Sequence, residues 1–85
     1  MLNSNFINRE AAHFADVVRK QHDEPAEQVK EILSRVTQRE PTEEEIEKGV
    51  SLMIAWQEED SLDANQALNN FCLAALNLNE FIFVE

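Results

Sequence analysis

The chain has 85 residues, of which 44% are hydrophobic and 28% are charged, a composition typical of globular rather than disordered proteins. At this length we expect a single domain over residues 1–85, because the chain is too short to enclose two independent cores. Residues 40–85 contain eleven of the 17 acidic side chains and one of the seven basic ones, and the formal net charge is −10. An acidic surface repels phosphate, which argues against binding to nucleic acid or to anionic membranes.

The chain contains one glycine and two prolines, which leaves few residues suited to β-turns and favours an all-α fold. No apolar run approaches the roughly 20 residues that span a bilayer, so we expect no membrane insertion. Apolar residues instead recur at helical spacing. This periodicity predicts a compact bundle of four helices, over residues 7–21, 25–38, 43–58 and 63–78.

Local signals mark where the predicted helices begin. Pro25 follows two acidic residues and suits the first position of a helix, where its missing N–H costs nothing. Thr42 and Glu45 form the pattern of a capping box, and Ser61 or Asp63 can cap the last helix.

Two features of the predicted helices concern packing. Gly49 weakens the third helix by about 1 kcal/mol relative to alanine, which indicates a close helix crossing at that point. We expect the third helix to bury four apolar residues: Ile46, Val50, Met53 and Ile54. The fourth helix is apolar on more than one face, so we expect it to contact several helices at the centre of the bundle. Residues 81–84 are aromatic or β-branched, a composition that allows an extended tail.

Few residues suggest chemistry. Cys72 has no cysteine partner and lies in an apolar stretch, so we interpret it as a core residue. Glu10 and His13 have the spacing of one half of a di-metal site, but the second such pair is missing and His22 does not supply it. The acidic residues near the third helix follow no calcium-loop pattern. We therefore predict no catalytic residue, no metal and no cofactor in this chain.

Polar residues near the end of the fourth helix permit two interpretations. Asn77, Asn79 and Glu80 can bond to the last helical carbonyls. Alternatively, together with Phe81 and Phe83, they form a docking surface for other domains or for a protein partner.

Three short strings carry a resemblance to a known family: Asn3-Ser4-x-Phe6, Arg39-Glu40-Pro41-Thr42 with Glu44-Glu45-Ile46, and LNLNEFIFV over residues 76–84. They resemble the C-terminal end of the planctomycete-specific domain family of unknown function. Its pattern is N-S-x-F, a helix, G-R-x-P-T-x-x-E, another helix, and L-N-x-N-E-F followed by an aromatic pair. This sequence has Gln38 where the family usually carries glycine.

The resemblance implies that the chain is part of a longer exported or cell-envelope protein, in which cytochrome c-like and other planctomycete-specific domains precede it. The first hypothesis is a non-catalytic C-terminal module that mediates interdomain or protein–protein packing. Two alternatives stay open: an accessory part of a redox or hydrolytic enzyme whose active site lies upstream, and a stand-alone acidic adaptor.

Overall fold

The computed structural model describes the backbone of residues 5–84 and the side chains of residues 7–77. Within this part of the chain it contains helices and no β-strand. The helices are α1 (Asn5–Gln21), α2 (Pro25–Thr37), α3 (Glu43–Glu59) and α4 (Ala64–Val84). The Cα radius of gyration is 12.1 Å, close to the roughly 12 Å expected for a compact chain of this length. The predicted all-α four-helix bundle is therefore confirmed.

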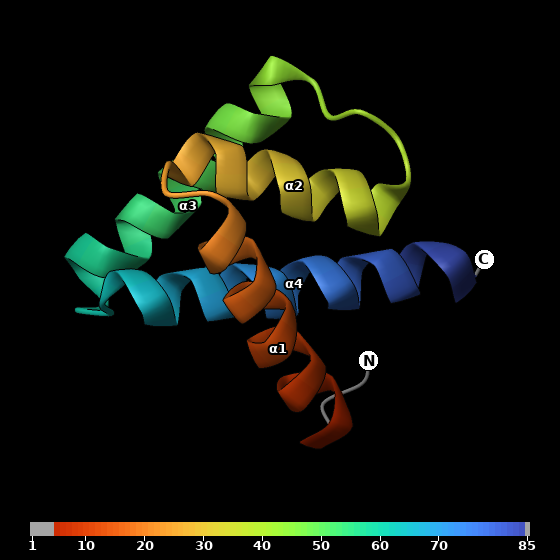
Figure 1. The fold of residues 1–85 in the computed structure, drawn as a ribbon, viewed down its shortest axis with the longest axis horizontal. Helices are drawn as coiled ribbons and strands as arrows, with labels where there is room; N and C mark the ends of the chain where they lie inside the picture. Colours follow the sequence, from red (N-terminus) through yellow and green to blue (C-terminus); the bar gives the residue numbers. More distant parts are fainter. Residues whose placement is uncertain (1–4, 85) are drawn as a thin grey trace.

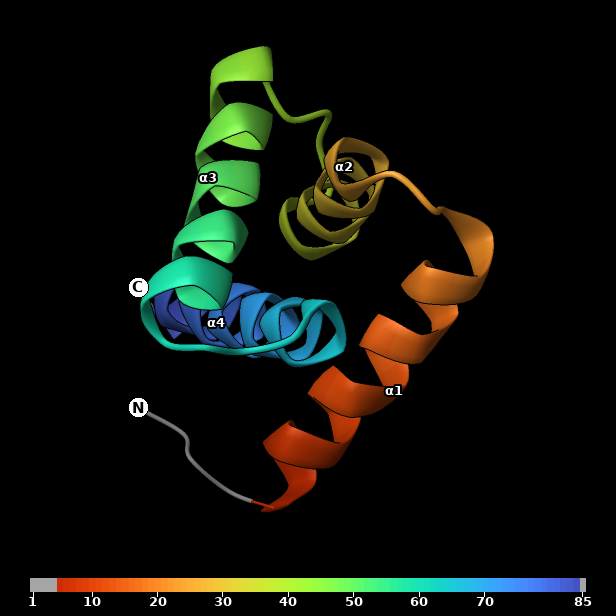
Figure 2. The same cartoon turned by 90° about the vertical axis from the view of Figure 1, so that its left-hand side faces the viewer.

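The helices form a central pair and two flanking helices. α2 and α4 run side by side in the same direction (Figure 1), and α1 and α3 cover opposite sides of this pair (Figure 2). α4 contacts each of the other three helices. The prediction that the fourth helix lies at the centre is therefore correct.

Side chains of the loops define the helix starts. Thr42 Oγ1 accepts a hydrogen bond from the Glu45 N–H at 3.1 Å, and Glu45 Oε1 accepts from the Thr42 N–H at 2.9 Å. This confirms the predicted capping box of α3. Asp63 caps α4 in the same way, because it exchanges hydrogen bonds of 2.7 and 2.9 Å with Gln66. Pro25 occupies the first turn of α2, as predicted.

The observed helices begin and end within two residues of the predicted bounds, except at the end of α4. α4 continues to Val84, so residues 81–84 are helical and not extended. No glycine or proline interrupts α4, and each added residue gains a hydrogen bond that outweighs the modest helix propensity of aromatic and β-branched residues. α2 ends at Thr37 rather than Gln38, because Gln38 adopts a left-handed conformation with φ 59° and ψ 32°.

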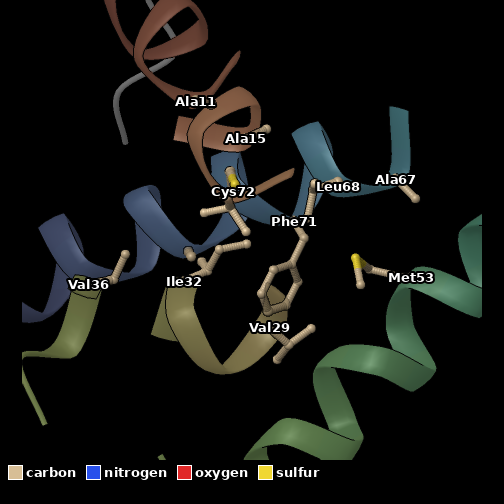
Figure 3. Packing of buried hydrophobic residues seen from close by; sticks show 12 residues of the cluster. Ala11, Ala15, Val29, Ile32, Val36, Met53, Ala67, Leu68, Phe71 and Cys72 are labelled. Atoms are coloured by element: carbon tan, nitrogen blue, oxygen red, sulfur yellow. The ribbon is translucent and has the colours of Figure 1, made fainter. Parts of the chain in front are cut away.

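The core is built from all four helices (Figure 3). The Phe71 side chain points from α4 toward Val29 of α2, with Met53 of α3 beside it. The buried residues of the core are Ala11, Ala15, Val18, Val29, Ile32, Val36, Met53, Ala67, Leu68, Phe71, Cys72 and Ala75. α1 contributes two alanines and a valine to this core, and small side chains of this kind suit close packing of helices.

Gly49 of α3 lies directly against Val29 of α2 and Phe71 of α4. A Cβ atom at this position would lie 2.6 Å from Val29 Cγ1 and 3.0 Å from Phe71 Cζ, so the predicted close crossing is confirmed. The buried face of α3 centres on Gly49 and Met53. Ile54, which the sequence placed in the core, is 46% exposed, because consecutive helical residues are about 100° apart around the axis.

Gly49→Ala is expected to destabilise the fold by about 1–3 kcal/mol through overpacking, although alanine favours a helix by about 1 kcal/mol. Val29 is fully buried and has a stiff branched side chain, so the backbones must separate to admit the methyl group. Urea unfolding measures the effect. Ser51→Ala, at an exposed position of the same helix, is the control. In a double-mutant cycle, Gly49→Ala should cost less stability in the Val29→Ala background than in the parent chain. Equal stability of Gly49→Ala and the parent chain would contradict this packing.

Candidate functional site

The connection between α2 and α3 contains the Arg-x-Pro-Thr string and holds the two helices together. Arg39 forms a bidentate ion pair with Glu45, with Nη2–Oε2 and Nη1–Oε1 distances of 2.7 and 3.1 Å. Pro41 is buried. Within the described part of the chain, the side-chain hydrogen bonds of Arg39, Thr42 and Glu45 all join residues of this turn to one another. These hydrogen bonds fix the shape of the turn.

Glu45 has the largest electrostatic perturbation in this turn. The hydrogen bond from Arg39, followed by that from the Thr42 N–H, lowers the pKa of the Glu45 carboxyl from 4.5 to about 2. The ionised carboxylate is thus the form that the fold stabilises.

The candidate metal ligands do not converge. Glu10 and His13 are both exposed on α1. His22 instead faces α2, where its Nε2 lies 3.5 Å from Glu31 Oε1. Glu31 also pairs with Arg35, and the Arg35 hydrogen bond is the main reason that the pKa of Glu31 lies below 4.5. No group of three His, Cys, Asp or Glu side chains suited to a metal occurs among the described residues.

Cys72 is a core residue. Its side chain is fully buried, and burial raises the pKa of the thiol to about 12. A thiol with such a pKa stays protonated near neutral pH and is a poor nucleophile.

The predicted docking residues lie near the end of α4. Asn77 is half-buried. The side chains of Asn79, Glu80, Phe81 and Phe83 lie outside the described residues, so the choice between capping and docking stays a prediction. The backbone places all of them on the final turns of α4, which extend past the end of α2 in the view of Figure 1.

Two surface grooves border α4. The first, which we call the amide groove, has a volume of about 280 Å³ and lies between α1 and the first half of α4. Its polar lining consists of carboxamides from Asn8, Gln66, Asn69 and Asn70, and its apolar lining of Ala11, Ala12, Leu62 and Leu73. The second, the apolar groove, measures about 440 Å³. Its apolar lining comes from Ile7, Phe14, Val17 and Leu76, and its polar lining from Glu10, His13 and Arg35.

The interpretation of the sequence missed the amide groove, although α4 carries a signal for it. Residues 64–79 contain no Asp, Glu, Lys or Arg, in a chain where 28% of residues are charged. Gln66, Asn69 and Asn70 share one face of α4 with the half-buried Leu73. A helix face exposed to solvent normally carries charged side chains, so their replacement by carboxamides marks this face as unusual.

None of the helices, over the described residues, is long and apolar enough to cross a membrane. Comparisons with protein-family models, curated proteins and solved structures gave no match to this chain.

The ion pair at Glu45 predicts a pH dependence of folding. Because folding lowers the pKa of this carboxyl from 4.5 to about 2, its stabilisation is complete above about pH 4.5 and is lost as the pH falls toward 2. Glu45→Gln should therefore be less stable than the parent at pH 6, and the difference should shrink below about pH 4.5 and vanish below about pH 2. Thermal unfolding across this range tests it. Glu44→Gln removes a charge from the same turn without breaking the Arg39 pair and should not reproduce the effect.

The left-handed Gln38 predicts a stabilising substitution. For an L-residue this conformation costs roughly 1–2 kcal/mol, and glycine avoids that cost. After allowing for the entropy of glycine in the unfolded chain, Gln38→Gly should raise the free energy of unfolding by roughly 0.5–1 kcal/mol. Gln57→Gly, within α3, is the control and should instead destabilise the fold by about 1 kcal/mol. A loss of stability in Gln38→Gly would contradict the conformation of this turn.

Proposed function

We propose that this chain is a non-catalytic helical interaction module that packs through α4 against a protein partner or against other domains of a longer exported protein. The observation that carries the proposal is the absence of charge on residues 64–79, which include exposed positions of α4. Depletion of charged residues is the compositional mark of the core of a protein–protein interface. On a helix face that is always exposed to water, charged side chains are the usual choice.

Exposure along α4 supports this proposal. Asn70 and Ala74 are exposed, and Asn77 is half-buried. Carboxamides and alanines can be covered by a partner at a much smaller desolvation cost than carboxylates or ammonium groups. The apolar groove adds aliphatic and aromatic surface where α1 meets α4. The apolar sequence of residues 81–84 continues α4 beyond Leu76, and the predicted docking residues belong to this part of the helix.

The placement in an exported multidomain protein rests on the resemblance to the planctomycete-specific family. The left-handed conformation of Gln38 is one that glycine adopts readily, in agreement with the glycine that the family usually carries there. The Arg39–Glu45 pair and the Thr42 cap give structural roles to the remaining residues of the same string.

Photo-crosslinking in the source cells tests the interaction. A benzophenone amino acid replaces Phe81 on α4 or, as a control, Gln57 on α3. We expect a specific crosslinked protein, or a crosslink to another domain of the same polypeptide, from position 81 alone. Asn70→Lys with Ala74→Lys should reduce this crosslink by at least tenfold, because burying unpaired charges costs more than about 1.4 kcal/mol.

The matched control is Ser51→Lys with Gln57→Lys, which adds the same two positive charges at exposed positions of α3 and should leave the crosslink from position 81 unchanged. Both double variants alter exposed positions only, so their unfolding midpoints should confirm that the fold persists. Equal crosslinking from positions 57 and 81, or equal sensitivity to the two double variants, would contradict a docking role of α4.

A further inference from the structure

The amide groove differs from the rest of the surface in its chemistry. Among the described residues that line it, the polar ones all carry carboxamides and none carries a charge. α1 contributes Asn8 to one wall, and α4 contributes Gln66, Asn69 and Asn70 to the other. At about 280 Å³, the groove is at the lower limit of ligand cavities, which measure about 300–1,000 Å³. It therefore suits a short segment rather than a folded domain.

Existing hydrogen bonds orient two of these carboxamides. Gln66 Oε1 accepts from the Asp63 N–H at 2.9 Å, and Asn69 Oδ1 accepts from Arg19 Nη2 at 3.5 Å. Each of these side chains therefore keeps its NH₂ group for another acceptor. The carboxamides of Asn8 and Asn70 form no hydrogen bond within the described part of the chain. The groove thus offers N–H donors together with carbonyl acceptors.

We propose that the amide groove binds a short, extended and uncharged peptide segment, an inference that rests on the proposed function because the segment would belong to the partner. A carboxamide has the same donor and acceptor groups as a peptide unit, so carboxamides can pair with the N–H and C=O groups of a backbone. Leu62 and Leu73 provide an apolar surface for small side chains. None of the lining residues carries a charge to offset the hydration that a charged segment would lose, and the nearby Arg19 guanidinium is already paired with Asp16.

Nuclear magnetic resonance of the ¹⁵N-labelled full chain tests the inference, because side-chain NH₂ signals report directly on the four carboxamides. The probe is the capped peptide acetyl-Ser-Ala-Leu-Ala-Ser-amide. We expect saturable shifts of the NH₂ signals of Asn8, Gln66, Asn69 and Asn70. The same peptide with methylated backbone nitrogens should bind at least roughly tenfold more weakly, because two or more hydrogen bonds of about 1 kcal/mol each are lost.

Two double variants locate the site. Asn8→Ala with Asn70→Ala should weaken binding of the parent peptide by roughly tenfold. Asn65→Ala with Gln57→Ala removes two exposed carboxamides that do not line the groove and should leave binding unchanged. The inference is overturned if the peptide does not shift the four signals, if methylation of its backbone nitrogens does not weaken binding, or if both double variants bind it equally.

The two proposals can fail separately. Crosslinking from α4 without peptide-induced shifts would preserve the interaction module and reject the amide groove as a peptide site. Peptide binding at the four carboxamides without crosslinking from α4 would preserve the groove as a peptide site and reject docking through the end of α4.

Discussion

The contact between Gly49, Val29 and Phe71 determines how three of the helices are arranged. Phe71 is a core residue of α4, and its ring lies against Val29 of α2 (Figure 3). α3 can cover this pair only because Gly49 presents no side chain to it. The approach of α3 fixes one flank of the central pair, and α1 covers the opposite flank (Figure 2). Coverage from these sides leaves Asn70 and Ala74 of α4 exposed.

Features that depend on a few neighbouring residues could be predicted from the sequence. Thr42 and Glu45 are three residues apart, and their reciprocal hydrogen bonds need only the local geometry of a helix start. The destabilising glycine within α3 signalled a close crossing for a similar reason, since a helix keeps such a residue only where packing requires it. The number and order of helices follow from the same local rules.

Features set by tertiary geometry could not be predicted in this way. Ile54 was assigned to the core because it is apolar, yet the angle at which α3 meets α2 and α4 decides which of its apolar residues are covered. The amide groove is a similar case, because Asn8 and Gln66 come from opposite ends of the chain. Only the packing of α1 beside α4 brings them together. The sequence does show that residues 64–79 carry no charge. This absence becomes informative only when the structure shows that Gln66 and Asn70 are exposed.

The distribution of charge also bears on what can cover α4. Two copies of this chain that paired through their α4 faces would bring two bodies of formal charge −10 together. Their repulsion is screened only beyond about 8 Å at physiological ionic strength, so it opposes such a dimer. A neutral or basic partner meets no such repulsion and still covers the carboxamides and alanines of α4. If α4 is a docking surface, as we propose, this net charge therefore weighs against pairing of two copies through it.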